Sequence, residues 1–212
     1  MRQKLVIRDD IIVDPPRGPI GISFSGGVES SLLVYLALKQ LTEYPIHLFT
    51  VSVSFRNFNQ HVVTGRVLGK ICEITKNFNV FQHFTIGDDA SIVDKLFATP
   101  ESFVTDYNII NSLLVGGNAN PPDTVIKDTV FFKDGKGPMD RDRNPNIKRY
   151  IKRNFYRYAP FTNLNKQDII QLYKNHGIDK SILPLTQSCW TDPPCNDCWF
   201  CFERNWGMQV LD

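Results

Sequence analysis

Four cysteines near the C-terminal end of this chain have a spacing that can hold a metal ion. They are Cys189, Cys195, Cys198 and Cys201. Thiolates separated by two residues suit one tetrahedral Zn²⁺ ion with Zn–S bonds of about 2.3 Å, and four thiolates leave no position for water. The spacing therefore predicts a closed, structural zinc site. An iron–sulfur cluster is the alternative metal centre, and a redox-active Cys-x-x-Cys pair is a third interpretation, which the fourth cysteine disfavours.

A second motif with chemical potential is the segment Ser-Gly-Gly-Val-Glu-Ser-Ser at residues 25–31. Gly26 and Gly27 permit a backbone of positive φ and a close approach to a ligand. A helix that begins here presents free N–H groups and the positive end of its dipole. With the serine hydroxyls, this predicts a cradle for phosphate or pyrophosphate. A strand-to-helix turn with a serine cap is the alternative, which the preceding strand and the acid at Glu29 disfavour.

Two other phosphate-binding motifs are absent from the sequence. Neither Gly-x-x-x-x-Gly-Lys-Ser/Thr nor Gly-x-Gly-x-x-Gly occurs, so nothing supports a kinase-like γ-phosphate site or a dinucleotide fingerprint. The four histidines are scattered along the chain, support no catalytic dyad and are expected to be structural. They are His47, His61, His83 and His176. The lone Cys72 lies on the apolar face of an expected helix and is expected to be a core residue.

The elements that must position these motifs alternate along the N-terminal half of the chain. Apolar patterning predicts strands at 19–25, 46–53, 80–86 and 112–115, and helices at 29–41, 59–77 and 90–97. This order predicts an α/β fold with a parallel sheet and helices on both faces. Ligands bind beyond the carboxyl ends of such strands, and two glycine pairs, at 26–27 and 116–117, fall at such ends. Residues 4–7 and 11–13 are expected to add edge strands.

The C-terminal half is predicted to be less regular. Residues 116–159 are rich in Pro, Asn, Asp and Arg, so we expect an irregular segment on the substrate side. A helix is predicted at 165–177, with Asn165 and Asp168 as a reciprocal cap and Gly177 as its stop. We expect one α/β domain over 1–180, which carries the Ser-Gly-Gly motif, and a zinc-binding segment over 181–212.

Composition places the chain among ordinary globular proteins. Of its 212 residues 42% are hydrophobic and 22% charged, and the net charge is +2. The sequence has no apolar run of ~20 residues that would span a bilayer and no signal-peptide pattern at its start. We therefore expect a cytoplasmic protein without membrane partners. The small net charge gives no general argument for nucleic-acid binding.

The segment 25–30 resembles the Ser-Gly-Gly-x-Asp-Ser PP-loop of the N-type ATP pyrophosphatases. That superfamily cleaves ATP between its α and β phosphates, adenylates a carbonyl or carboxylate oxygen and lets a nitrogen or sulfur nucleophile displace AMP. The resemblance implies ATP and Mg²⁺ as cofactors and adenosine near residues 52–55. The implied nucleotide-binding residues are Ser23, Phe24, Ser25, Gly26, Gly27, Val28, Glu29, Ser30, Ser31 and Val53. The implied catalytic residues are Ser25, Glu29, Ser30 and Lys166.

One residue of this motif departs from the family pattern. Glu29 stands where the family usually has Asp. The extra methylene moves the carboxylate by about an ångström, which is enough to re-aim a magnesium or hydroxyl contact.

The two motifs together resemble the 7-cyano-7-deazaguanine synthases. Those enzymes convert 7-carboxy-7-deazaguanine, ammonia and ATP to the nitrile and carry a structural zinc on four cysteines before an arginine, here Arg204. The segment 160–170 is also similar to their proline-to-lysine segment. The resemblance implies zinc on the four cysteines, a small deazapurine-like substrate, ammonia and a homodimer. The family's Pro-Gly-Arg-Asn segment is missing near Thr99, and residues 116–123 match poorly, so a related acceptor is expected.

A basic and aromatic stretch over residues 141–158 leaves other functions open. Its basic residues are Arg141, Arg143, Lys148, Arg149, Lys152, Arg153 and Arg157, interleaved with Tyr150, Phe155, Tyr156 and Tyr158. Such interleaving suits a phosphate backbone with stacked bases, a lid over ATP phosphates or a solvated loop. One alternative function is therefore a PP-loop enzyme that thiolates or modifies tRNA or DNA. The other is a non-catalytic nucleotide-binding module with a degenerate PP-loop.

Overall fold

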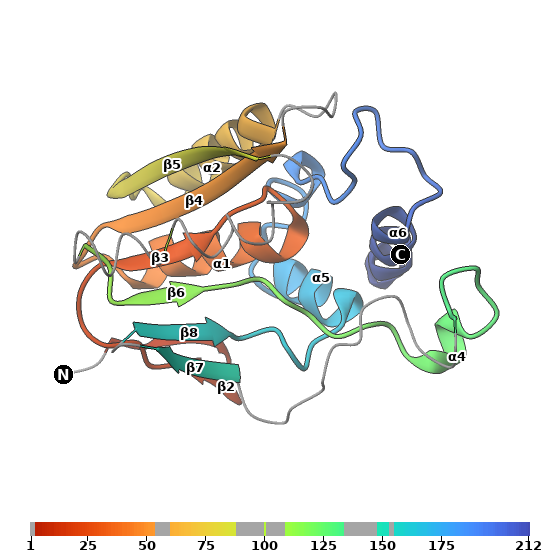
Figure 1. The fold of residues 1–212 in the computed structure, drawn as a ribbon, viewed down its shortest axis with the longest axis horizontal. Helices are drawn as coiled ribbons and strands as arrows, with labels where there is room; N and C mark the ends of the chain where they lie inside the picture. Colours follow the sequence, from red (N-terminus) through yellow and green to blue (C-terminus); the bar gives the residue numbers. More distant parts are fainter. Residues whose placement is uncertain (1–2, 54–59, 88–99, 101–108, 134–147, 153–154) are drawn as a thin grey trace.

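The computed structural model describes residues 3–53, 60–87, 100, 109–133, 148–152 and 155–212 (Figure 1). Its strands are β1 (Leu5–Arg8), β2 (Ile11–Val13), β3 (Ile20–Ser23), β4 (Ile46–Val53), β5 (Val80–Gly87), β6 (Ser112–Leu114), β7 (Lys148–Lys152) and β8 (Phe155–Ala159). Its helices are α1 (Val28–Gln40), α2 (Gln60–Thr75), α4 (Asp123–Ile126), α5 (Lys166–Asn175) and α6 (Trp199–Met208), with 3₁₀ turns η2 (Leu183–Leu185) and η3 (Gln209–Leu211). No helix among the described residues is long and apolar enough to cross a membrane.

The main sheet has six strands in the order β5-β4-β3-β6-β8-β7 (Figure 1). Five of them are parallel, and β7 pairs antiparallel with β8 at one edge. In β3, Ile20, Gly21 and Ile22 are all buried, as expected for a central strand covered on both faces. The predicted parallel α/β sheet is therefore confirmed.

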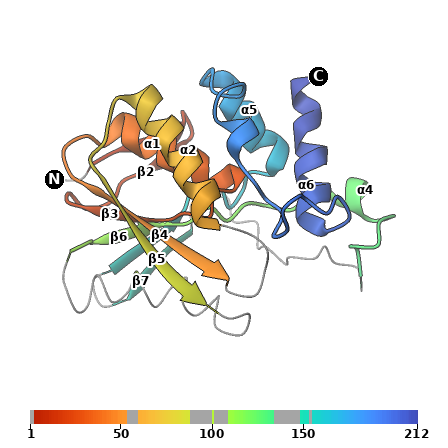
Figure 2. The same cartoon turned by 90° about the horizontal axis from the view of Figure 1, so that it is seen from above.

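Helix α1 occupies the centre of the main core. Ten of its thirteen residues are buried, so it is apolar on nearly all sides rather than amphipathic. It packs on β3, α2, α5 and β1, and α1 and α2 cover the same face of the sheet (Figure 2). The expected helix at 90–97 lies outside the described residues.

The first two strands do not extend the main sheet, contrary to expectation. β1 and β2 form a separate antiparallel pair, with Leu5 opposite Val13. Their buried side chains alternate with exposed ones, so only one face packs on the core. The side chain of Gln40 at the end of α1 accepts a hydrogen bond from the Val6 amide and donates one to the Val6 carbonyl, both 2.8 Å long. These two hydrogen bonds use the Val6 backbone groups that a neighbouring strand would otherwise pair with.

Residues 116–159 contain more regular structure than the sequence predicted. They include α4, β7 and β8, and β8 pairs in parallel with β6. The rings of Tyr156 and Tyr158 stack with centroids 6.4 Å apart. Charged residues interrupt the apolar alternation here, which hid strands that depend on pairing with residues far away in sequence. Residues 134–147 and 153–154, which include Arg141, Arg143 and Arg153, lie outside the described residues.

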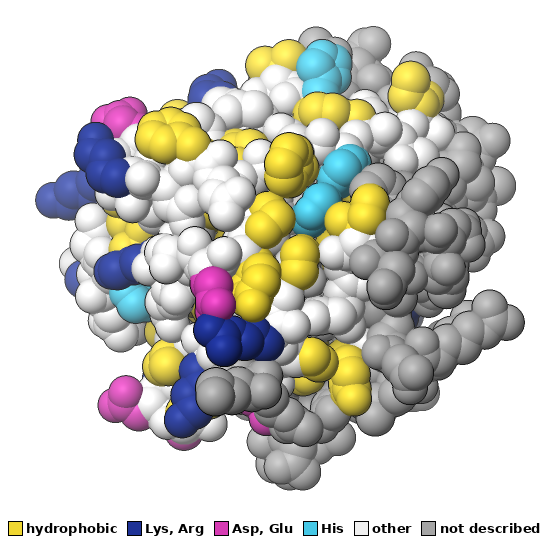
Figure 3. Space-filling view, turned by 90° about the vertical axis from the view of Figure 1, so that its left-hand side faces the viewer, with side chains coloured by type: hydrophobic (Ala, Val, Ile, Leu, Met, Phe, Trp, Pro, Cys, Tyr) yellow, Lys and Arg dark blue, Asp and Glu magenta, His cyan; other side chains and the backbone are white. Residues whose placement is uncertain are grey.

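Two of the four histidines lie side by side across β4 and β5. His47 Nδ1 and His83 Nε2 are 3.0 Å apart, and their rings stack with centroids 5.2 Å apart. Phe49 stacks on His83, and Phe81 packs against His47. Burial and the neighbouring His83 lower the pKa of His47 to about 4, and burial lowers that of His83. Figure 3 shows histidine and hydrophobic side chains next to one another on one surface. Both histidines thus make packing contacts, as a structural residue does, and they also contact each other.

Helix α5 begins with the predicted reciprocal cap. The Asn165 side chain accepts from the Asp168 amide at 3.1 Å, and the Asp168 carboxylate accepts from the Asn165 amide at 2.9 Å. Gly177 has a φ of 66° beyond its end, as a helix stop requires. The cap fixes Lys166 as the first helical residue.

Candidate functional site

The Ser-Gly-Gly turn joins the carboxyl end of β3 to the start of α1. Gly26 has a φ of 74°, whereas Gly27 is extended with a φ of −74°. The expectation of positive φ therefore holds for Gly26 alone. A Cβ atom at Gly26 would lie 2.9 Å from Val63 Cγ1, so α2 packs directly on the turn. Both the conformation and the packing at this position require glycine.

The turn leaves backbone amides of α1 open to a ligand. The Ser31 amide donates the first helical bond, to the Gly27 carbonyl at 3.0 Å, and no side chain caps the helix at Gly27. The amides of residues 28–30 precede this bond and have no carbonyl acceptor within the helix. Ser25 Oγ and Ser30 Oγ lie 3.1 Å apart beside them. Amides and hydroxyls thus lie together at the start of α1, an arrangement that suits an anion, and the binding of a phosphate there stays a prediction.

The other residues assigned to nucleotide binding differ in accessibility. The side chains of Phe24, Val28 and Ser31 are buried, so only their backbone atoms can face a nucleotide. The Ser23 hydroxyl is buried at the end of β3 and has no hydrogen-bond partner among the described residues. Val53 ends β4, and residues 54–55 of the expected adenosine border lie outside the described residues.

A buried ion cluster lies behind the cradle. The Lys166 ammonium contacts Glu29 Oε1 and lies 3.5 Å from Glu203 Oε2. The Asn118 side chain donates to Glu203 Oε1 at 2.8 Å. Lys166 and Glu203 are 3% and 1% exposed. The cluster therefore joins the first turns of α1 and α5 to α6 and to the segment after β6.

Two glycines make the close packing around this cluster possible. A Cβ atom at Gly116 would lie 2.9 Å from Glu29 Cβ and 3.1 Å from the Ser30 amide. A Cβ atom at Gly207 would collide with Lys166 Cγ. The segment after β6 thus contacts the start of α1 directly, and helix α6 contacts Lys166 of α5. The sequence predicted the glycine pair at 116–117 as a strand end, and this contact explains why the first of them is glycine.

Sequence reasoning missed Glu203 and Asn118. One signal for Glu203 was present, because Trp199, Glu203 and Gly207 recur every four residues and are all buried. A carboxylate at a buried helical position needs a partner. The identity of that partner depends on tertiary packing, which the helical period does not reveal.

The four cysteine sulfurs form one compact group. Cys189 Sγ lies 3.5 Å from Cys195 Sγ and 3.9 Å from Cys198 Sγ, and Cys195 Sγ lies 4.0 Å from Cys201 Sγ. All four lie within 4.8 Å of one another. Sulfurs bound tetrahedrally to one zinc ion at about 2.3 Å would be about 3.8 Å apart. In an iron–sulfur cubane each sulfur binds a different iron, which spreads the sulfurs further. The donor set therefore fits a single ion.

The cysteines differ in how easily they release a proton. Burial raises the pKa of Cys189, but hydrogen bonds from Thr191 and from the Cys195 amide outweigh it and lower the pKa to about 6. Burial raises the pKa of Cys201 to about 12. Metals bind thiolates, so metal binding has to displace protons from the group.

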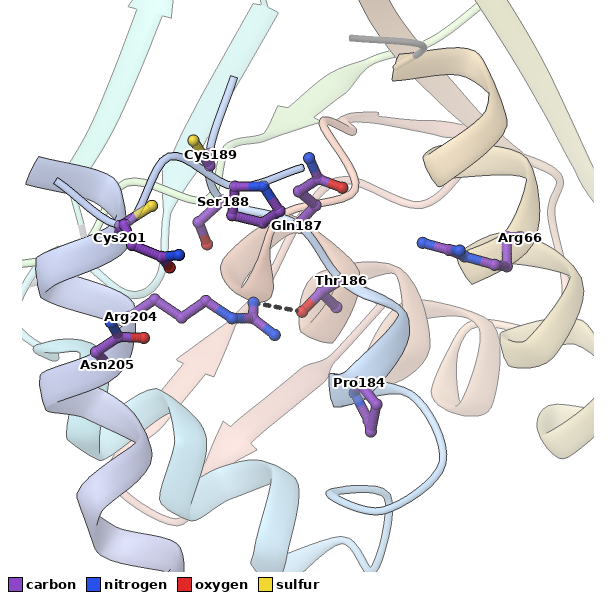
Figure 4. A pocket seen from close by; sticks show the side chains of 11 residues that line it. Arg66, Pro184, Thr186, Gln187, Ser188, Cys189, Cys201, Arg204 and Asn205 are labelled. Carbon is purple, nitrogen blue, oxygen red and sulfur yellow. Dashed lines mark hydrogen bonds between the residues drawn. The ribbon is translucent and has the colours of Figure 1, made fainter. Parts of the chain in front are cut away.

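A polar pocket of about 280 Å³ is lined by residues of α2, of α6 and of the segment 184–196, which includes Cys189 (Figure 4). Arg66 of α2 and Arg204 of α6 approach it from opposite sides. Arg204 donates to Thr186 Oγ1 at 2.8 Å and to the Leu183 carbonyl at 3.1 Å. The Gln187 amide, in the same wall, donates to the Gly26 carbonyl at 3.0 Å. The pocket wall therefore connects the cysteine segment to the cradle.

Comparisons with known proteins support the resemblance drawn from the motifs. No family model matches the chain. The chain is 24% identical over 220 residues to 7-cyano-7-deazaguanine synthase from Aquifex aeolicus (strain VF5), a match that covers 90% of this chain and 96% of that protein.

Among solved structures, the fold is similar to that of the U34-tRNA thiolase NcsA from Methanococcus maripaludis, which is described with its 4Fe-4S cluster. The TM-score is 0.50 at 13% identity, and the match covers 92% of this chain and 65% of the thiolase chain. NMN synthetase from Francisella tularensis matches with a TM-score of 0.45 at 18% identity, over 88% of this chain and 75% of that one. These likenesses concern the fold. The chain is thus similar in sequence, over nearly its whole length, to a 7-cyano-7-deazaguanine synthase, and it has the parallel α/β fold that its PP-loop motif predicted.

Proposed function

We propose that this protein uses ATP to adenylate the carboxylate of a 7-deazaguanine-like molecule and converts it with ammonia to the amide and nitrile. One observation carries the proposal: the uncapped start of α1 brings together the Ser25 and Ser30 hydroxyls and the Glu29 carboxylate that contacts Lys166. Such a site can hold a triphosphate and stabilise the charge that develops on pyrophosphate as it leaves. The similarity to a 7-cyano-7-deazaguanine synthase supports the choice of acceptor.

The reaction requires positioning and charge stabilisation rather than a covalent nucleophile. The acceptor carboxylate oxygen attacks the α-phosphorus, and the bond to the β-phosphate breaks to release pyrophosphate. Ammonia then attacks the acyl carbon, AMP leaves and a proton is lost, which gives the amide. A second adenylation, on the amide oxygen, followed by loss of AMP and protons gives the nitrile. In both rounds Ser25, Ser30 and the α1 amides hold the phosphates, and Lys166 offsets their charge.

Glu29 is the carboxylate in the cradle that would hold magnesium. Bound there, magnesium would neutralise charge on the phosphates. Glu29 Oε1 also contacts Lys166, so this side chain faces both the cluster and the cradle. The longer Glu, in place of the family's Asp, reaches the lysine in this arrangement.

We propose Zn²⁺ as the ion held by Cys189, Cys195, Cys198 and Cys201. The sulfur spacing suits one ion, and two ligands, Cys198 and Cys201, belong to the start of α6. Bound there, zinc would cross-link residues 189–201 and supply folding free energy rather than reactivity.

A single incubation tests the proposed function. Purified protein is mixed with ATP, Mg²⁺, ammonium and 7-carboxy-7-deazaguanine, and the products are followed by mass spectrometry. We expect AMP, pyrophosphate and the amide or nitrile, all dependent on the acceptor. The matched control omits the acceptor. Bound ATP without AMP under these conditions would contradict the proposal and favour the non-catalytic nucleotide-binding module.

A nucleic-acid acceptor is the second candidate. It is favoured by the edge strand β7, whose five residues include Lys148, Arg149 and Lys152. Binding to phosphates would weaken steeply with salt, since each neutralised phosphate releases counterions. Binding of tRNA or DNA that is lost when Arg149 and Lys152 are replaced by Gln would support this acceptor instead of the small molecule.

A further inference from the structure

Helix α6 begins at the cysteine centre and ends against the nucleotide side of the molecule. Cys198 is its N-cap residue, and Cys201 lies in its first turn. Two residues further on, Glu203 lies 3.5 Å from the Lys166 ammonium. The spacing within one short helix therefore places this carboxylate at a fixed distance from the cysteine centre.

Lys166 needs a counter-charge that does not move. Its ammonium is almost completely buried, and a buried charge without a partner is strongly unfavourable. Of its two carboxylate partners, Glu29 is 14% exposed at the side chain, whereas Glu203 is 2% exposed. A magnesium ion bound with the nucleotide would attract the Glu29 carboxylate away from the lysine. Glu203 would then be the carboxylate that stays paired with Lys166 and holds it in place.

The surroundings hold Glu203 in this orientation. The Asn118 side chain donates to Glu203 Oε1 at 2.8 Å, and the other carboxylate oxygen, Oε2, faces Lys166. Gly207, one turn further along α6, has no room for a side chain against the stem of Lys166. The carboxylate is thus held on one side by an amide and on the other by close helix packing.

We propose that Glu203 is a positioning residue of the nucleotide site. It acts through Lys166, whose ammonium it holds beside the cradle while Glu29 binds the magnesium of the nucleotide. Through α6 it also makes the position of Lys166 depend on the cysteine centre. The inference rests on the proposed function, because it assumes that the cradle binds ATP.

The test compares Glu203→Gln with a matched surface change. Glutamine keeps the size of the side chain and an oxygen for Asn118 but removes the charge. Glu73→Gln is the control, because Glu73 forms an ion pair of the same kind with Lys70, 2.9 Å long and on the surface. For Glu203→Gln we expect kcat/KM for pyrophosphate release to fall by roughly 10- to 100-fold, as for a small misplacement of a reacting group. Glu73→Gln should match the wild type, and thermal unfolding and metal content confirm folding of both.

A double-mutant cycle separates positioning from a general structural role. If Glu203 acts through Lys166, Glu203→Gln has little further effect once Lys166→Gln is present. Full additivity overturns the inference, as does unchanged pyrophosphate release in folded Glu203→Gln. If Lys166→Gln does not fold, Glu203→Asp, which keeps the charge, takes its place in the test. Pyrophosphate release no faster in Glu203→Asp than in Glu203→Gln then overturns the inference.

A binding measurement distinguishes failure of the inference from failure of the proposed function. The same variants are titrated with Mg-ATP, which needs no acceptor. If the wild type binds ATP without turnover, weaker binding by Glu203→Gln alone supports the inference and equal binding overturns it. If the wild type binds no ATP, the proposed function and the inference fall together.

Discussion

The Ser-Gly-Gly turn and the cysteine centre are connected through residues 187–189 but are built differently. The turn is made mainly by backbone: a left-handed residue, open helical amides and close approaches where glycine is required. The cysteine centre is made by four side chains from residues 189–201. The turn should therefore be damaged by added atoms and the centre by removed ones. This contrast predicts which substitutions matter in each region.

The largest effect is expected for Cys198→Ser. Serine is smaller and a poor zinc ligand, and structural zinc contributes on the order of 10 kcal/mol in small domains. We expect loss of the bound metal and a large fall in the unfolding temperature of the C-terminal region. Metal analysis and protease sensitivity measure this. The control is Cys72→Ser, a buried cysteine outside the centre, which should keep the metal. Full metal content in Cys198→Ser would break the contrast.

The next largest effect separates the two glycines of the turn. Gly26→Ala forces a left-handed alanine, which costs roughly 1–2 kcal/mol, and also pushes on Val63. It should lower both stability and ATP turnover. Gly27→Ala brings the new Cβ within 3.2 Å of Ser25 Oγ, its other contacts are at ordinary distances of 3.7 Å, and the backbone there is unstrained. It should therefore keep stability but lose turnover by roughly 100-fold. Equal stability losses in denaturant titrations would contradict the assignment.

A smaller effect is expected at the histidine pair, which lies near the amino ends of the strands. His47 is 7% exposed with its pKa lowered to about 4, so the folded state favours the neutral ring. Stability is therefore full above pH 6.5 and falls as pH drops toward 4, by about 2 kcal/mol between pH 7.5 and 5. His47→Gln should remove this part of the pH dependence in denaturant titrations. An unchanged pH dependence of stability in His47→Gln would refute this assignment. The metal content of the variant should equal that of the wild type.

The smallest effect is expected for helix α5, whose Lys166 contacts Glu29 of α1 and Glu203 of α6. Asn165→Ala removes one half of the reciprocal cap of α5 and should cost about 1 kcal/mol of stability. Because Lys166 is the next residue, turnover should fall slightly while metal content is unchanged. Asn175→Ala, at the other end of the same helix, is the control for stability. A fall in turnover larger than the loss of folded protein explains would show that the cap positions the lysine.

Much of the fold could be predicted because its signals are local. The strand at 46–53 is observed with the predicted bounds, since β-branched and aromatic residues run without interruption there. The helix at α5 was predicted from its capping residues. The turn at 25–27 was predicted from residue type, except that Gly27 is extended.

Features that depend on distant residues could not be predicted in the same way. β1 and β2 form their own sheet rather than edges of the main one, and alternation alone does not name a partner. β7 and β8 were hidden by their charged residues. For the site, the resemblance indicated Lys166, but its contacts with Glu29 and Glu203 join segments far apart in the chain.

The absence of a side chain at Gly207 limits how this protein can change by mutation. Any larger residue there would collide with the stem of Lys166. The Cβ atom of such a residue would also lie 2.9 Å from Ile170 Cδ1 and 3.0 Å from Lys166 Cβ, so a shorter side chain at 166 alone would not make room for it. Replacing this glycine therefore requires a shift of α6 against α5, and we expect lineages that keep Lys166 to keep glycine at 207.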